Sequence, residues 1–205
     1  MVAASNGLLH GPLSAGTVHV CLDMQNLFGP TGPWATPWME RVLPVTVQLS
    51  RHYEGRTIFT RFIPPASADD EIGVWRRFYR RWEEVTRPHL QPKMLDVVDE
   101  LLAVGKHVPV IDKGRFSAFS ALAFHEALNA RRADTLILSG AETDMCVLAT
   151  ALGAIDAGFR VIIVEDAVCS SSDEGHDALM TLYRHRFAEQ VETVGSDILL
   201  AMTPP

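Results

Sequence analysis

Short, almost continuously apolar runs alternate along the chain with longer stretches in which apolar residues recur every three or four positions. The apolar runs predict β-strands at 17–23, 57–63, 108–111, 135–139, 160–164 and 190–194. The middle runs are apolar nearly throughout, which is typical of strands covered on both faces. The periodic stretches predict helices at about 38–52, 93–104, 121–132, 145–157 and 174–187. This alternation predicts one α/β domain over 1–205, a three-layer α/β/α sandwich around a six-stranded, mostly parallel sheet.

The stretch 63–92 fits the alternation least well, and 1–16 precedes the first strand as an N-terminal extension. Four aromatic residues in 63–92 are spaced to share one face of a short helix: Trp75, Phe78, Tyr79 and Trp82. An aromatic face packed on the core, with arginines in water, is the favoured interpretation. A lid or a subunit contact over an active-site edge is the alternative, and the two are compatible.

Composition and charge exclude several functions. The net charge of −7 argues against a nucleic-acid-binding surface, and no apolar run approaches the roughly 20 residues that a membrane helix needs. Three cysteines without a CxxC pair argue against a disulfide framework or a thiolate zinc site. Residues 1–16 do not resemble a signal peptide, so we expect a cytoplasmic protein. Glycine-rich nucleotide motifs are absent, which disfavours a flavodoxin-like nucleotide domain.

Three residues with complementary chemistry follow three different strands. Asp23 closes the first strand, Lys113 follows the third, and Cys146 begins a helix after a glycine turn that ends the fourth. Carboxyl ends of parallel strands meet at one edge of the sheet, where ligands bind. Each residue alone has an ordinary structural explanation: a helix cap, a surface lysine and a core thiol. Together they predict a nucleophilic site in which Asp23 moves the thiol proton and Lys113 and the helix N-terminus hold a thiolate.

Other histidine and cysteine residues are weaker candidates for a metal-binding or catalytic role. His19, Cys21 and Asp23 share one face of the first strand, but a covered sheet offers poor metal geometry, so no metal is expected there. Cys169 is expected to be a passive apolar residue. His176 is expected to cap or pack.

Three segments carry a family resemblance: DMQN at 23–26, KGRFSAF at 113–119 and SGAETDMCVLATALGAIDAGFRVIIVEDAVCSSSDEGH at 139–176. On these segments the chain resembles the isochorismatase-like cysteine hydrolase superfamily, which includes nicotinamidases, N-carbamoylsarcosine amidases, ureidoacrylate hydrolases and biuret hydrolases. The resemblance implies that Asp23, Lys113 and Cys146 form the family's triad. It also implies a cis peptide bond between Ala141 and Glu142, with the N–H groups of Glu142 and Cys146 forming an oxyanion hole.

Departures from the family narrow the expected reaction. Nicotinamidases carry an Asp-x-His metal motif after the second strand, where this chain has 61–65, RFIPP. A metal-dependent nicotinamidase is therefore disfavoured, and no cofactor is expected. Isochorismatases proper cleave a vinyl ether and lack the cysteine, so Cys146 favours hydrolysis of a C–N bond. The expected substrate is a small amide, ureido or carbamoyl compound, cleaved through a thioester with release of ammonia or an amine.

Residues near the predicted edge are candidates for substrate contact. Arg61 is interpreted either as a carboxylate-binding residue or as a structural ion pair. Phe62, Trp75 and Phe116 are candidates for an apolar pocket. Gln25 supports Asp23, touches substrate or serves only the chemistry of the turn. A homo-oligomer, dimer or tetramer, is also expected. The alternative function is a non-hydrolytic small-molecule-binding or redox-sensing domain on the same fold.

Overall fold

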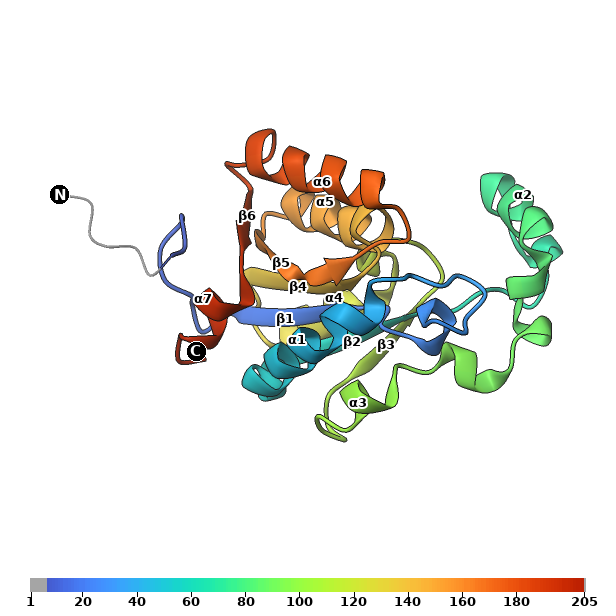
Figure 1. The fold of residues 1–205 in the computed structure, drawn as a ribbon, viewed down its shortest axis with the longest axis horizontal. Helices are drawn as coiled ribbons and strands as arrows, with labels where there is room; N and C mark the ends of the chain where they lie inside the picture. The colour runs from blue at the N-terminus through green and yellow to red at the C-terminus, as the bar shows by residue number, and fades with distance from the viewer. Residues whose placement is uncertain (1–6, 205) are drawn as a thin grey trace.

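A single parallel sheet runs through the middle of the computed structural model, which describes residues 7–204 (Figure 1). Its strand order is β3-β2-β1-β4-β5-β6, and every neighbouring pair is parallel. The strands are β1 (Thr17–Leu22), β2 (Thr57–Phe62), β3 (Val110–Lys113), β4 (Thr135–Ala141), β5 (Arg160–Cys169) and β6 (Val191–Val194). The predicted six-stranded α/β sandwich is therefore confirmed.

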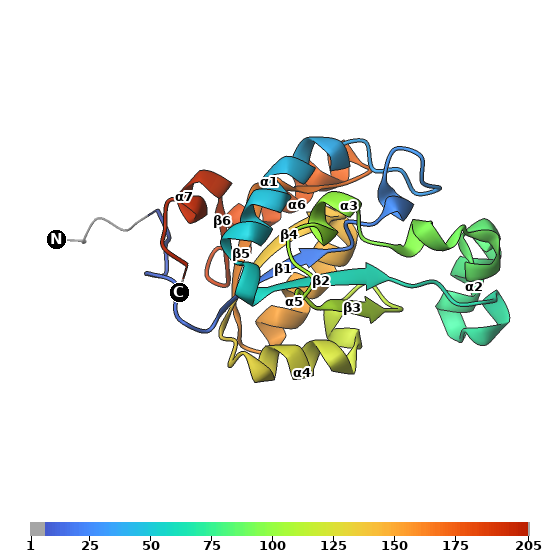
Figure 2. The same cartoon turned by 90° about the horizontal axis from the view of Figure 1, so that it is seen from below.

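Helices cover both faces of the sheet (Figures 1 and 2). They are α1 (Met39–His52), α2 (Gly73–Arg81), α3 (Asp99–Leu102), α4 (Leu122–Ala130), α5 (Leu148–Asp156), α6 (Asp173–His185) and α7 (Ser196–Leu200). Apolar residues of α4, α5 and α6 pack on one face, and those of α1, α3 and α7 pack on the other. Among the helices of residues 7–204, α2 alone stands away from the sheet, at the end opposite the chain termini.

Shorter helical turns fill the connections. The 3₁₀ turns are Asn26–Phe28, Glu54–Arg56, Ala68–Asp70, Glu83–Val85, Arg87–His89, Pro92–Leu95 and Ala118–Ser120, and a π turn spans Thr143–Val147. Within residues 7–204, none of the helices has the length and apolar character needed to cross a bilayer.

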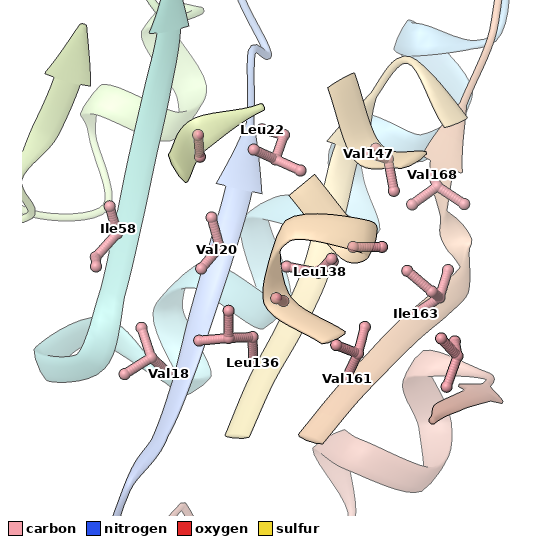
Figure 3. Packing of buried hydrophobic residues seen from close by; sticks show 14 of the residues in the cluster. Val18, Val20, Leu22, Ile58, Leu136, Leu138, Val147, Val161, Ile163 and Val168 are labelled. Carbon is pink, nitrogen blue, oxygen red and sulfur yellow. The ribbon is translucent and has the colours of Figure 1, made fainter. Parts of the chain in front are cut away.

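The core follows the two-residue period of the strands. Val18, Val20 and Leu22 of β1 point into one apolar layer, which also receives side chains from β2, β4 and β5 (Figure 3). His19 and Cys21 point to the other face. His19 is fully buried there, and its ring nitrogens contact the hydroxyl groups of Thr57 and Ser139 at 3.2 and 2.8 Å.

The predicted continuous helix at 93–104 is wrong, because a 3₁₀ turn ends at Leu95 and only Asp99–Leu102 is α-helical. The chain between Pro92–Leu95 and the single turn of α3 is extended, because its backbone bonds to the segment after β1. Asn26 N–H donates to the carbonyl of Asp96 at 3.0 Å, and Val98 N–H donates to that of Met24 at 2.9 Å. Tertiary hydrogen bonds therefore override the local helical pattern.

The predicted limits of several strands also change. The fifth strand continues to Cys169, because pairing with β4 resumes at Val168 after an irregularity between Leu138 and Gly140. Cys169 is thus a buried residue at the end of β5, although it lies beyond the strand predicted at 160–164. The third strand runs later than predicted, so that Lys113 is its last residue. Ser172 caps α6, because its hydroxyl accepts a hydrogen bond from Gly175 N–H.

A buried carboxylate on β6 holds the N-terminal extension. Oε2 of Glu192 accepts hydrogen bonds from the N–H groups of Leu9 and His10 at 2.6 and 3.2 Å. Its Oε1 receives Arg160 Nε at 2.7 Å, and the Arg160 guanidinium also donates to the carbonyls of Gly11 and Pro12. One carboxylate therefore joins the extension to two strands.

We expect Glu192→Gln to lower the free energy of unfolding by about 2–4 kcal/mol, because it removes the charge that pairs with Arg160 and replaces one acceptor with a donor. Urea unfolding monitored by circular dichroism measures the change. Glu189→Gln, an exposed change of the same kind, is the control and is expected to stay within about 0.5 kcal/mol of the unmodified protein. Equal stabilities for the two variants would contradict this account.

Candidate active site

The three predicted catalytic residues meet at one edge of the sheet. Asp23 directly follows β1, Lys113 ends β3, and Cys146 lies in the π turn that follows β4. β1 and β4 are neighbours in the sheet, but the chain continues from β1 to β2 and β3 on one side and from β4 to β5 and β6 on the other. This is a topological switch point, where open α/β sheets form a crevice. The site is therefore produced by the strand order itself.

A fully buried ion pair forms the base of the site. Lys113 Nζ lies 2.6 Å from Asp23 Oδ2, and both side chains have no exposed surface. The Thr60 hydroxyl donates to Asp23 Oδ1 at 2.6 Å, and its oxygen accepts from Asp23 N–H at 3.2 Å. Asp23 has φ 49°, a left-handed conformation that aspartate tolerates better than most residues. The carboxylate is held from both sides.

Lys113 also contacts the candidate nucleophile. Its Nζ donates to Cys146 Sγ at 3.4 Å and to the carbonyl of Arg115 at 3.0 Å. The Phe62 ring lies on the same ammonium, with its centre 5.1 Å from Nζ. One cation therefore connects the carboxylate and the sulfur, as the predicted triad requires.

Electrostatics keep the resting cysteine neutral. Burial and the neighbouring Asp23 carboxylate raise the pKa of Cys146 well above its usual value, and the opposing effect of Lys113 does not offset them. Burial alone would lower the pKa of Lys113, but Asp23 and Cys146 raise it overall, so the ammonium stays protonated. The predicted preformed thiolate is wrong. That prediction included the stabilising effects of the helix N-terminus and Lys113, but not the burial of the thiol next to the Asp23 carboxylate.

The raised pKa of Cys146 predicts its reactivity toward iodoacetamide. Only the thiolate reacts, so the alkylation rate is expected to climb with pH through 9 without levelling off. Asp23→Asn removes a cause of the raised pKa and is expected to speed alkylation at neutral pH. Peptide mass spectrometry resolves the three cysteines, and Cys169, whose buried thiol has a pKa of about 12, is the internal control. A plateau below pH 8, or slower alkylation of the asparagine variant, would contradict this account.

A cavity of about 420 Å³ opens above the sulfur. Cys146 is only 4% exposed, and the surface that it retains faces this cavity. Most of the wall is apolar or aromatic: Phe28, Pro33, Trp34, Ala35, Phe62, Phe78, Trp82, Phe116 and Met145. The polar wall residues besides Cys146 are Glu142, Asp144 and Ser171. The volume is in the range of small-molecule sites.

Two of the five predicted substrate-contacting residues, Phe62 and Phe116, line this cavity; Gln25, Arg61 and Trp75 are not among its wall residues. Trp75 lies behind the wall, in a neighbouring groove, with its ring centre 4.9 Å from that of Phe116.

Gln25 and Arg61 have structural partners instead. Gln25 is fully buried; its Oε1 accepts from Phe62 N–H at 2.6 Å, and its Nε2 donates to the carbonyls of Phe62 and Leu95. It therefore supports the strand ends. Arg61 makes a two-bond contact with Asp112 at 2.7 and 3.0 Å and a further contact with Asp96 at 3.2 Å. The ion-pair interpretation of Arg61 is the one that the structure shows.

Sequence reasoning missed Phe28 and Trp34. Trp34 lies at the centre of the aromatic wall, with its ring centre 6.0 Å from Phe62 and 5.9 Å from both Phe78 and Trp82. It belongs to an irregular segment, where no periodic pattern marks a side chain as inward-facing. All four residues of the predicted aromatic face pack on the core, with Tyr79 fully buried, and Phe78 and Trp82 also line the cavity.

The turn that presents Cys146 depends on two backbone features. The peptide bond between Ala141 and Glu142 is cis, as the resemblance implied. Gly140 has φ 102°, and a Cβ there would collide with the carbonyl oxygen of Leu22, so only glycine lets β4 approach β1 this closely. His176 buttresses the turn, because its Nδ1 contacts the Thr143 hydroxyl at 2.9 Å. Within residues 7–204, no three His, Cys, Asp or Glu side chains gather as a metal site.

Comparison with known proteins agrees with this geometry. A family model described as the isochorismatase domain matches residues 17–194. Maleamate amidohydrolase of Pseudomonas putida is 32% identical over 58% of this chain and 53% of its own length, and N-carbamoylsarcosine amidase of Arthrobacter is 28% identical over 72% and 57%. The chain thus spans about half the length of these curated relatives. A cysteine hydrolase from Pseudomonas syringae shares the fold, with TM-score 0.79 and 22% identity over 94% of this chain and 95% of its own. The chain belongs to the isochorismatase family.

Proposed function

We propose that the protein is a cysteine-dependent amidohydrolase that cleaves a C–N bond of a small amide, ureido or carbamoyl compound. The observation that carries this proposal is the buried Lys113 ammonium, which contacts Asp23 at 2.6 Å and Cys146 at 3.4 Å at the base of the cavity. Burying both charges is costly, and a purely structural role does not require a thiol as the third partner. Similarity to two amidases of the same family supports the same reaction class.

The neutral thiol determines how the reaction begins. Asp23 accepts the Cys146 proton as Sγ attacks the carbonyl carbon, so the sulfur becomes anionic only when an electrophile is present. The protonated Asp23 then donates that proton to the departing nitrogen as the C–N bond breaks, which leaves a thioester. Asp23 next takes a proton from water, the hydroxide attacks the thioester, and the acid product leaves as the thiol is restored. Lys113 stabilises each anionic species in turn.

The negative charge on the carbonyl oxygen also requires partners. We propose that the backbone N–H groups of Glu142 and Cys146, two residues of the cavity wall, bind this oxyanion. Each such donor typically contributes about 2.7–4 kcal/mol to transition-state stabilisation. This part of the proposal follows the family pattern.

The burial of Cys146 argues against the alternative redox-sensing function. Redox-sensor cysteines are accessible and have low pKa values, whereas Cys146 is 4% exposed and its pKa is raised. A non-hydrolytic binding domain would use the same cavity but would not need Asp23 and Lys113 in contact with sulfur. Both observations support the enzyme.

A screen for ammonia or amine release tests the proposal. Primary amides, ureides and carbamoyl amino acids are incubated with the protein and with its Cys146→Ala variant, which is the blank. Release above the blank by at least one compound, with a covalent adduct at Cys146 trapped by mass spectrometry during turnover, supports the proposed reaction. Binding of compounds without any release across the panel would favour the binding domain instead.

A further inference from the structure

Six aromatic side chains surround the space above the nucleophile. They are Phe28, Trp34, Phe62, Phe78, Trp82 and Phe116. They come from four separate parts of the chain, and Trp34 joins them, because its ring contacts those of Phe28, Phe62, Phe78 and Trp82 with centres about 6 Å apart. Aromatic faces carry partial negative charge and attract cations, most strongly where water is excluded.

The charged residues of the wall are all acidic. Glu142 and Asp144 line the cavity, and no lysine, arginine or histidine is among its wall residues. The nearest buried cation, Lys113, is already paired with Asp23. Arg115 is paired with Glu71 at 2.7 Å, and Arg61 is paired with Asp112. Arg81 lies over the Trp82 ring but is exposed to solvent and lines the neighbouring groove. A carboxylate entering the cavity would therefore meet no free cation.

The Glu142 side chain has an oxygen available for a ligand. Oε1 of Glu142 accepts from Ser171 N–H at 2.9 Å and from the Thr36 hydroxyl at 3.4 Å. Among residues 7–204 these are the only hydrogen bonds to the Glu142 carboxylate, and both leave Oε2 free. Asp144 Oδ1 accepts from the Ser170 hydroxyl at 2.6 Å, and its Oδ2 lies near Gly175 in the first turn of α6.

We propose that the cavity selects amides whose non-reacting end is an apolar or aromatic group with a positive charge, and that it rejects amides ending in a carboxylate. The aromatic walls desolvate and attract the cation, and Glu142 supplies the counter-charge. This inference rests on the proposed function, because it assigns the non-reacting part of the substrate for the same thiol.

Three substituted benzamides test the inference, and the cationic and uncharged ones have the same shape. They carry a trimethylammonio group, an uncharged tert-butyl group or a carboxylate, each at position 3 or 4 so that the distance from amide to charge varies. kcat/KM is measured by amide hydrolysis, and Kd is measured with the Cys146→Ser variant by quenching of tryptophan fluorescence. We expect the cation to exceed the tert-butyl compound by about tenfold in kcat/KM and the carboxylate by more.

Matched variants identify the residue responsible. Glu142→Gln is expected to remove most of the advantage of the cation over the tert-butyl compound, while Glu126→Gln, an exposed change on α4, leaves that advantage unchanged. Equal use of the carboxylate and the cation, or no advantage over the tert-butyl compound, would overturn the inference and leave the proposed function intact. Binding in the expected order without hydrolysis would instead overturn the proposed function and support the charge preference.

Discussion

Replacing Cys146 with alanine is expected to reduce amide hydrolysis to the background rate, a loss of about 10⁴-fold or more in kcat/KM. Without the sulfur no thioester forms, and Asp23 and Lys113 are left facing an empty position. Cys146→Ser is expected to be nearly as inactive, because Asp23 is too weak a base for a hydroxyl group whose pKa lies far above that of a thiol. Steady-state ammonia release on the best substrate of the screen measures both losses.

Cys169→Ala is the matched control for this prediction. Cys169 is also a free, buried cysteine, but it pairs with Ala141 inside the sheet and does not line the cavity. Its removal is expected to cost some stability through lost packing and to leave kcat/KM within a few-fold of the unmodified protein. Full turnover by the Cys146→Ala protein would rule out covalent catalysis by this residue.

The second large effect is expected from Asp23→Asn. The substitution keeps the shape of the side chain but leaves the Lys113 ammonium buried without a counter-charge, since both side chains lack exposed surface. Breaking a buried pair from one side typically costs about 3–5 kcal/mol of stability. The variant also loses the group that moves the proton, which is expected to lower kcat/KM by about 10²–10⁴-fold. Urea unfolding and hydrolysis assays measure the two losses separately.

A double variant separates the structural role of Asp23 from its chemical role. In Asp23→Asn with Lys113→Met, no charge remains buried, so much of the lost stability is expected to return. Activity is expected to stay at the level of the single variant or below it. Recovery of activity together with stability would mean that the ion pair acts only as a structural element, and the proposed proton transfer would then be wrong.

These two predictions depend on residues that the sequence alone identified. Asp23, Lys113 and Cys146 could be found because each follows a recognisable strand, and parallel strands present their carboxyl ends at one edge. The family motifs around Cys146 specified the turn further. Residues at the ends of regular elements are predictable in this way, since the sheet fixes where they lie.

The surroundings of the site were less predictable. Gln25 lies two residues after Asp23, and Arg61 lies near the end of β2, but their partners, the backbone of Phe62 and the carboxylate of Asp112, depend on side-chain directions that spacing does not determine. Trp34 could not be predicted as a wall residue, because its segment has no regular spacing of apolar residues. The continuous helix expected at 93–104 does not form, because backbone groups in this stretch form hydrogen bonds with the segment after β1 instead.

The sequence by itself determined the layered α/β fold and the three side chains at the strand ends, because periodic burial and the alternation of strands and helices can be read locally, and its motifs indicated the family. Only the tertiary structure decided that the Cys146 thiol rests neutral and that its cavity is aromatic and acidic. The physical reason is that pKa and cavity shape depend on how much water is excluded and which charges stand nearby. Both are set by residues distant in sequence, here Asp23, Lys113 and the wall around Trp34, once the chain has folded.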